Sequence, residues 1–302
     1  MKNQYIADIG DYGKYGLLRF LAGKGIKIGV NWYLTSDDGS SDGKFTGYLE
    51  NEKERFRDPE LFDSLRHIAG CPEKSVEMIQ NEGLIPGACY YAEPIPCTGQ
   101  DMRARRINRS LWFNNSTLYL HDAELIFADP DNGNTMVKKE GSKGIEKYTL
   151  PQELKEYYNH GHNVVYYCSK GRRKWEAWED TKTEMQSVLP DCNIYALTFH
   201  KGTQRTYIFL IHPKDFQRYM RILSEFLRSS WKGAFTVEYI NGVDPSDTVV
   251  SNELVIPLRN GKNISMSMTA DGWVKITTPK GMTVKEKPDD FVGSFLDRSF
   301  YW

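Results

Sequence analysis

The stretch ELIFADPDNGN, residues 124–134, gives the clearest indication of the fold. Its four consecutive apolar residues, 125–128, are typical of a strand that is buried on both faces of a parallel sheet. The sequence Asp-Pro-Asp-Asn-Gly (129–133) follows at once, and its proline and glycine end any regular structure. In open α/β sheets, ligands bind beyond the carboxyl ends of the strands. The stretch therefore predicts a buried strand whose end faces a ligand-binding site.

Strand patterns and amphipathic helix patterns alternate on both sides of this segment. Further strands are predicted at 26–34, 88–95 and 163–169, and helices at 11–23, 58–70, 73–81, 99–117, 149–161, 172–189 and 214–231. Such alternation implies a mainly parallel, doubly wound sheet. Two last strands, 194–200 and 206–212, are separated by too few residues for a crossover connection, so they must form an antiparallel hairpin.

The pattern changes after residue 231. Residues 232–302 read as short alternating strands, with turns predicted at 259–262, 270–272 and 279–281. We therefore expect a Rossmann-like α/β domain at 1–231 that ends in an antiparallel hairpin, and a small β-rich C-terminal domain at 232–302.

Composition restricts the functional classes. The formal net charge of −1 creates no whole-molecule attraction to nucleic acid, so any such attraction must come from local patches. No segment approaches the roughly 20 apolar residues of a membrane span. The five cysteines are odd in number and lack CxxC spacing, which favours reduced thiols over a disulfide framework or a structural zinc site. A cytoplasmic protein without a membrane partner is expected.

The acidic turn supplies the candidate catalytic residues Asp129, Asp131 and Asn132. A carboxylate and backbone carbonyls at the end of a strand can accept hydrogen bonds from an exocyclic amine. They would orient the nitrogen lone pair toward an electrophile, which is catalysis by positioning. The same residue types also form ordinary turns, and this alternative stays open.

A second candidate lies near the N-terminus, in the sequence Asp-Ile-Gly-Asp-Tyr-Gly-Lys-Tyr (8–15). Its glycines would let a ligand approach the backbone at the start of a helix. The spacing is not that of the dinucleotide fingerprint. Tyr12, Gly13 and Lys14 are the candidate ligand-binding residues here, and the alternative is an N-terminal arm that packs through its tyrosines.

Asp37 and Asp38 lie in a loop that follows the first strand and is rich in Gly, Ser and Asp. A doubly wound fold often holds the ribose or phosphates of a cofactor at this point. The spacing does not match an EF-hand calcium loop. We therefore weigh contact with a small ligand above metal binding.

Basic residues with interleaved tryptophans suit contact with phosphates and stacking on bases. Solvated helix faces balanced by nearby acids are the alternative. The candidate nucleic-acid-binding residues are Arg103, Arg106, Lys170, Arg172 and Arg173.

Together, the Gly-Asp-Tyr-Gly-Lys-Tyr-Gly stretch (10–16), the acidic turn and the terminal hairpin resemble a class I methyltransferase-type Rossmann protein. The chain is distantly similar to RlmJ-type ribosomal-RNA adenine-N6 methyltransferases, which carry an Asn/Asp-Lys segment before their first strand and an Asp-Pro-Pro-Tyr turn after their fourth. It is also similar to bacterial and phage proteins that carry the same two motifs. The resemblance covers residues 4–213.

The resemblance implies S-adenosylmethionine as cofactor and an amine of nucleic acid as substrate. Asp129 and the Pro130 carbonyl would accept hydrogen bonds from the target amine, with Asp131 or Asn132 completing the site. The residues implied for the cofactor or base are Tyr12, Gly13 and Lys14, with Asp37 or Asp38 on the ribose hydroxyls.

Three functions follow from these observations. The first is S-adenosylmethionine-dependent methylation of a nucleic-acid amine. The second is a catalytically inactive relative that binds a nucleotide or nucleic acid, which is favoured by the lack of a glycine-rich turn after strand 26–34. The third is a Mg²⁺-dependent phosphodiesterase or nuclease that uses Asp129 and Asp131.

Overall fold

The computed structural model describes residues 1–39, 43, 45–96, 101–171, 173–240, 254–257, 262–269, 273–279 and 283–286. Arg172 lies outside these residues. Each of the turns predicted at 259–262, 270–272 and 279–281 lies wholly or partly outside them.

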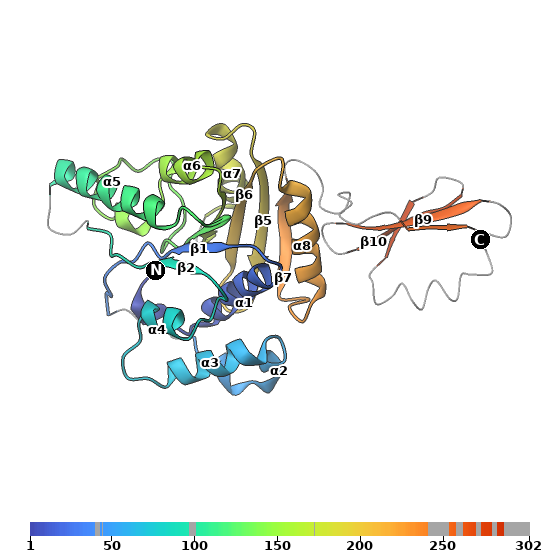
Figure 1. Ribbon diagram of the computed structural model, residues 1–302, viewed down its shortest axis with the longest axis horizontal. Helices are drawn as coiled ribbons and strands as arrows, with labels where there is room; N and C mark the ends of the chain where they lie inside the picture. Colours follow the sequence, from blue (N-terminus) through green and yellow to red (C-terminus); the bar gives the residue numbers. More distant parts are fainter. Residues whose placement is uncertain are drawn as a thin grey trace.

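A seven-stranded mixed sheet with helices on both faces forms the body of the protein (Figure 1). Its strands are β1 (Ile28–Asn31), β2 (Cys89–Tyr91), β3 (Leu125–Ala128), β4 (Asn163–Cys168), β5 (Asn193–Phe199), β6 (Arg205–Ile211) and β7 (Phe235–Ile240). The strand order is β2-β1-β3-β4-β6-β5-β7, and the first four strands in this order are parallel. The expected α/β fold with a mostly parallel sheet core is confirmed, and it is consistent with a Rossmann-like arrangement.

The predicted hairpin is also confirmed, because β5 and β6 pair antiparallel along their whole length. β6 lies between β4 and β5 and is antiparallel to both. The amino end of β6 therefore lies at the edge of the sheet where β3 and β4 end.

The boundary that we expected after residue 231 is wrong for the sheet. Strand β7 lies beyond that residue and pairs antiparallel with β5 from Phe235 to Ile240. The outer edge of β5 has backbone groups free to pair, and the chain supplies a partner strand shortly after α8. The large sheet therefore extends to residue 240.

Helices cover both faces of the sheet, and short 3₁₀ turns lie in the segments that precede or follow them. The α-helices are α1 (Ile9–Gly23), α2 (Glu52–Arg55), α3 (Pro59–Ala69), α4 (Val76–Asn81), α5 (Met102–Tyr119), α6 (Pro151–Asn159), α7 (Trp175–Thr183) and α8 (Phe216–Arg228). The 3₁₀ turns are η1 (Asn3–Tyr5), η2 (Gly47–Glu50), η3 (Ile145–Lys147) and η4 (Glu184–Ser187).

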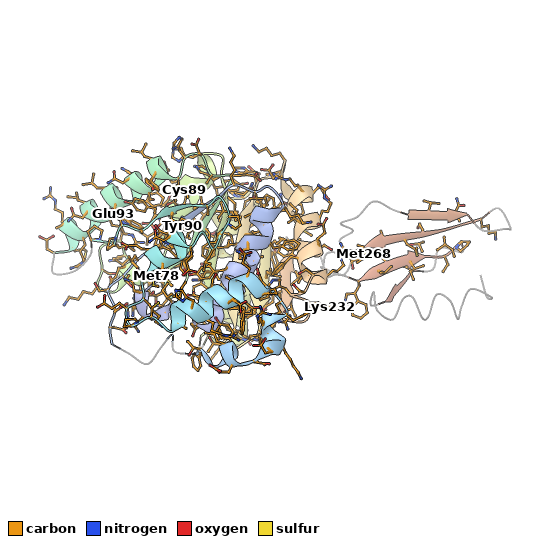
Figure 2. All side chains as sticks on the ribbon, turned by 60° about the horizontal axis from the view of Figure 1, so that its bottom comes forward. Met78, Cys89, Tyr90, Glu93, Lys232 and Met268 are labelled. Atoms are coloured by element: carbon orange, nitrogen blue, oxygen red, sulfur yellow. The ribbon has the colours of Figure 1, made fainter. Side chains whose placement is uncertain are left out.

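Two hydrophobic cores result from the alternation of side chains along the strands. Phe127 of β3 packs with residues of α1, α3, α4 and α8 on one face. Its neighbour Ile126 packs with residues of α5, α6 and α7 on the other. Side chains fill the space between these layers, and Met78 and Tyr90 pack at the margin of the first core (Figure 2).

Helix α1 is held close to the sheet by glycines. A Cβ atom at Gly13 would lie 2.7 Å from the Phe199 ring of β5, and one at Gly16 would lie 2.0 Å from the Trp231 ring. The helix begins at Ile9, earlier than predicted, because the Asp8 side chain accepts a hydrogen bond from the Gly10 N–H. Gly13 thus lets α1 pack closely on β5, and Gly16 makes room for Trp231 between α8 and β7.

A separate four-stranded antiparallel sheet follows along the chain, in the order β11-β10-β9-β8. Its strands are β8 (Leu254–Pro257), β9 (Asn263–Met268), β10 (Val274–Thr277) and β11 (Thr283–Glu286). Ile264, Val274 and Ile276 form its small core. The expected β-rich character of this part of the chain is confirmed for the described residues.

None of the helices in the described part of the chain combines the length and the apolar character needed to cross a bilayer.

Candidate functional site

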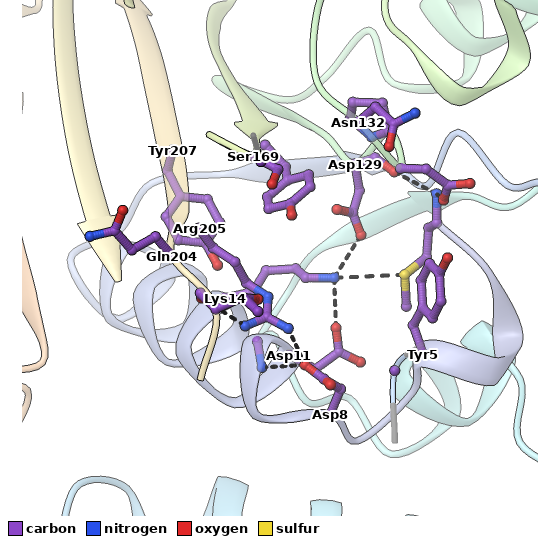
Figure 3. Close-up of a pocket in the computed structure, with 18 of the residues that line it drawn as sticks. Tyr5, Asp8, Asp11, Lys14, Asp129, Asn132, Ser169, Gln204, Arg205 and Tyr207 are labelled. Atoms are coloured by element: carbon purple, nitrogen blue, oxygen red, sulfur yellow. Dashed lines mark hydrogen bonds and ion pairs between the residues drawn. The ribbon is translucent and has the colours of Figure 1, made fainter. Parts of the chain in front are cut away.

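A cavity of about 540 Å³ lies at the carboxyl ends of β3 and β4 (Figure 3). The first turns of α1, the acidic turn after β3, residues 169–171 after β4 and the start of β6 all contribute to its wall. The sequence also predicts that Gly13-Lys14 and Asp129–Asn132 line one cleft, and this is confirmed for Lys14 and the turn, whereas Gly13 does not line the cavity. The meeting of Lys14 and the turn follows from the chain path: α1 leads directly into β1 and packs along the sheet, so its amino end lies at the carboxyl edge, where the turn after β3 also lies.

Lys14 links α1 to the acidic turn. Its Nζ lies 2.7 Å from Asp129 Oδ2 and 2.7 Å from Asp11 Oδ1, and all three residues are buried. The second oxygen of Asp11 accepts the N–H of Ala7 at 3.1 Å. Burial alone would lower the pKa of Lys14, but the two carboxylates raise it above its ordinary value. Lys14 therefore stays charged and holds Asp129 in one orientation.

Asp129 presents its other oxygen to the cavity. Oδ2 is the atom that contacts Lys14, while Oδ1 is turned toward the open space (Figure 3). The backbone N–H of Asp129 donates to the Asn31 carbonyl of β1, which anchors the turn to the sheet. A rigidly held carboxylate with one oxygen toward a cavity is a ready acceptor for a ligand N–H.

Asp131 and Asn132 have different surroundings from Asp129. Asp131 contacts the α-amino nitrogen of Met1 at 2.9 Å through Oδ1, and its Oδ2 accepts from the Thr35 hydroxyl at 3.2 Å. Asn132 lines the cavity, and its backbone N–H donates to the Lys147 carbonyl. The two aspartates of the turn therefore point to different partners.

Gly133 closes the turn. Its φ of +98° is one that L side chains rarely adopt, and a Cβ atom there would lie 2.7 Å from Cys168 Sγ. Glycine is thus required at this position for both reasons.

Most of the residues predicted to bind a cofactor contact the protein itself. The Tyr12 hydroxyl donates to the Glu54 carbonyl at 2.6 Å, and its ring stacks on Tyr48. Gly13 faces Phe199, as described above. Asp37 accepts the N–H of Gln4 at 3.1 Å. Asp38 forms an ion pair with Lys2 and accepts from the Gln4 side chain. Of these candidates in the described part of the chain, only Lys14 lines the cavity.

The end of β1, where a glycine-rich turn would hold a cofactor, is filled by the chain. Tyr33 adopts a φ of 44°, and its carbonyl accepts from the α-amino nitrogen of Met1 at 3.1 Å. The same nitrogen donates to the Asp129 carbonyl at 2.8 Å. On the other face, the Tyr33 hydroxyl donates to Glu153.

The predicted basic residues do not assemble at the cavity. Lys170 lines it and lies 4.7 Å from the ring centre of Trp175. Arg173 donates to the Ser169 carbonyl. Arg103 and Arg106 are exposed on α5. Arg172 lies outside the described residues.

The cavity-wall residues that sequence reasoning missed include Arg205 and Tyr207 of β6. Arg205 forms an ion pair with Asp8, and its guanidinium lies across Gly10, where a Cβ atom would fall 1.9 Å from Nε. The lack of a side chain at Gly10 thus makes room for this arginine. The available signal was the alternation of β6, which places residues 205 and 207 on one face.

Comparisons with models of known protein families and with curated protein sequences found no match. Among the described residues, no group of three or more His, Cys, Asp or Glu side chains is placed to hold a metal ion.

Proposed function

We propose that this protein is a methyltransferase-like Rossmann protein that binds the exocyclic amine of a nucleotide or nucleic-acid base at Asp129. The observation that carries the proposal is the carboxylate held by Lys14 at 2.7 Å through one oxygen, with the other turned to a cavity of about 540 Å³. A cavity of this volume is in the range that holds a small organic ligand.

The walls of the cavity suit such a ligand. The aromatic residues Tyr167 and Tyr207 can contact a planar base, and the cations Lys170 and Arg205 can contact phosphate. An exocyclic amine can donate to Asp129 Oδ1. Further support for the methyltransferase-like assignment is the acidic turn after a buried strand and the antiparallel β5–β6 hairpin that joins the sheet.

Methylation of the bound amine with S-adenosylmethionine is the second candidate function. The fixed acceptor at Asp129 favours it, because such a group orients the nitrogen lone pair without removing a proton. The residues predicted to hold the cofactor do not fit it, however, because Tyr12, Gly13, Asp37 and Asp38 contact the protein itself. The end of β1 is covered by Met1. We therefore derive no step through the cofactor.

The Mg²⁺-dependent alternative is not proposed. Its two aspartates would have to converge on one ion, whereas Asp129 contacts Lys14 and Asp131 contacts Met1 and Thr35.

Isothermal titration calorimetry tests the proposal, with AMP, S-adenosylmethionine, S-adenosylhomocysteine and Mg²⁺ in separate runs. We expect AMP to bind and Asp129→Ala to weaken it by about 1.5–3 kcal/mol, the range for a hydrogen bond to a charged group. The exposed Asp37, which does not line the cavity, gives the matched control: Asp37→Ala should leave the affinity unchanged.

Two outcomes would contradict the proposal. One is a wild-type protein that binds neither AMP nor an oligonucleotide. The other is an Asp129→Ala variant with a lowered thermal midpoint but unchanged affinity, which would leave the turn as a purely structural feature. Binding of S-adenosylmethionine would favour the second candidate function.

A further inference from the structure

Tyr207 combines a position in the cavity wall with a hydroxyl that lacks a partner. Its side chain is fully buried, and its hydroxyl makes no hydrogen bond with any residue that the structure describes. It lies beside Arg205 in the wall (Figure 3). On the sheet it is directly opposite Tyr167 of β4, and the two ring centres are 6.4 Å apart.

A buried hydroxyl without a partner is uncommon, because burial removes its hydrogen bonds to water. Burial also raises the pKa of Tyr207 well above its ordinary range, with Arg205 opposing and Asp129 adding to the rise. The phenol therefore keeps its proton and can donate a hydrogen bond.

We propose that the Tyr207 hydroxyl donates a hydrogen bond to a ring nitrogen of the bound base. This nitrogen is the one next to the exocyclic amine that donates to Asp129, so the site selects adenine or cytosine over uracil. This inference rests on the proposed function and names the bases that the site would take. Adenine and cytosine both present an amine next to an unprotonated ring nitrogen on their Watson–Crick edge, the edge by which flipped bases are read. Uracil instead places a carbonyl oxygen against the Asp129 carboxylate, so that two acceptors meet.

Lys170 and Arg205 extend the argument from a base to a nucleotide. Both line the same cavity as Tyr207 and Asp129. Within the described residues, the Arg205 guanidinium contacts the Asp8 carboxylate and the Thr203 carbonyl, and it lies at the margin of the open space. A phosphate attached to the base would find cationic partners here. Nucleoside monophosphates are therefore suitable probes.

The chain offers a matched control in Tyr166 of β4. This residue is also fully buried, and its hydroxyl is also without a hydrogen bond to the described residues. It packs in the core on the opposite face of the sheet, with α5, α6 and α7, and does not line the cavity. Removal of either hydroxyl should affect folding alike, because neither loses a hydrogen bond within the described residues.

The experiment compares the wild type, Tyr207→Phe and Tyr166→Phe by calorimetry with AMP, CMP and UMP, together with their thermal midpoints. We expect the wild type to bind AMP and CMP more tightly than UMP. Tyr207→Phe should weaken the binding of AMP about tenfold, as the loss of one hydrogen bond would. Tyr166→Phe should leave AMP affinity unchanged, and neither variant should have a lower thermal midpoint. Short oligo(dA) and oligo(dT) distinguish nucleic acid from a free nucleotide as the source of the base.

Equal AMP affinity in the wild type and Tyr207→Phe would overturn this inference while leaving the proposed function intact. So would wild-type protein that binds UMP as tightly as AMP. Wild-type protein that binds none of the nucleotides or oligonucleotides would overturn both.

Discussion

Two buried ion clusters lie under helices on opposite faces of the sheet, and they differ in what surrounds them. In the first, Lys14 of α1 joins Asp11 and Asp129. In the second, Arg109 of α5 contacts both oxygens of Glu153, at 2.7 and 2.9 Å, and donates to two backbone carbonyls of the loop before α6. Both clusters pair a buried cation with buried carboxylate.

The surroundings of the carboxylates separate the two clusters. Glu153 accepts from the Arg109 guanidinium, the Tyr33 hydroxyl and the Leu150 N–H, so both of its oxygens are occupied by the protein. Asp129 instead turns one oxygen to a cavity, and Tyr207, whose hydroxyl has no partner among the described residues, lines the same cavity. A buried ion pair alone therefore does not identify a binding site. The useful sign is hydrogen-bonding capacity that the protein leaves unused.

The largest effect is expected in the cluster of Arg109 and Glu153, where the protein occupies both carboxylate oxygens. Glu153→Gln should cost about 3–5 kcal/mol of the free energy of unfolding, because it leaves the buried Arg109 without the carboxylate that it contacts through two nitrogens. Asp129→Asn should cost less, because Lys14 keeps Asp11. Urea denaturation of both variants measures the difference, and equal costs would contradict the distinction between the clusters.

An intermediate effect on stability is expected from a change of pH, through the cluster of Lys14, Asp11 and Asp129. Burial raises the pKa of Asp11 above its ordinary value of 3.8, although Lys14 opposes this. The protonated form is thus favoured by folding, and this contribution to stability is lost as pH rises through the raised pKa. Asp11→Asn, which cannot ionise, should therefore become more stable relative to wild type as pH rises through that range.

Thermal midpoints of the wild type and Asp11→Asn across that range give the measurement. Curves that stay parallel as pH changes would show that Asp11 has no raised pKa in the folded protein.

The smallest effect is expected on the exposed face of α5, the helix that also carries Arg109. Arg106→Gln should change the free energy of unfolding by no more than about 0.5 kcal/mol, as is usual at exposed positions. If Arg106 binds a nucleic-acid phosphate, the same variant should bind an oligonucleotide more weakly. The slope of the logarithm of the binding constant against the logarithm of the salt concentration should then fall in magnitude by about one. Unchanged binding would identify Arg106 as ordinary solvated surface.

The features that sequence predicted well depend on local patterns. An N-cap aspartate followed by proline predicts the start of α3, and the structure confirms it at Asp58 and Pro59, as it confirms the hairpin with its short connection. The meeting of Lys14 with the acidic turn was also predictable, because a helix that leads directly into a parallel strand has its amino end at the carboxyl edge of the sheet. Helical spacing gave a further sign that was not used: Asp11 and Lys14 are three residues apart and lie on one face of α1, whereas Tyr12 and Gly13 face elsewhere.

The features that sequence reasoning missed depend on the order of strands in the sheet. Arg205 and Tyr207 reach the cavity because β6 inserts antiparallel between β4 and β5. The pairing of β7 with β5, which moves the end of the large sheet past residue 231, is likewise a matter of which strand edge is available. Local propensity contains neither piece of information.

The ion pairs around the cavity have a consequence for the order in which the chain folds. Lys14 is 115 residues from Asp129 in the sequence, and Asp8 is 197 residues from Arg205. Contacts of such separation are slow to form, because the entropy of closing a long loop is lost before the contacts compensate for it. During synthesis, the first turn of α1 must wait for β6 to leave the ribosome before the wall is complete. The cavity is therefore a late product of folding, although its first residues are among the earliest made.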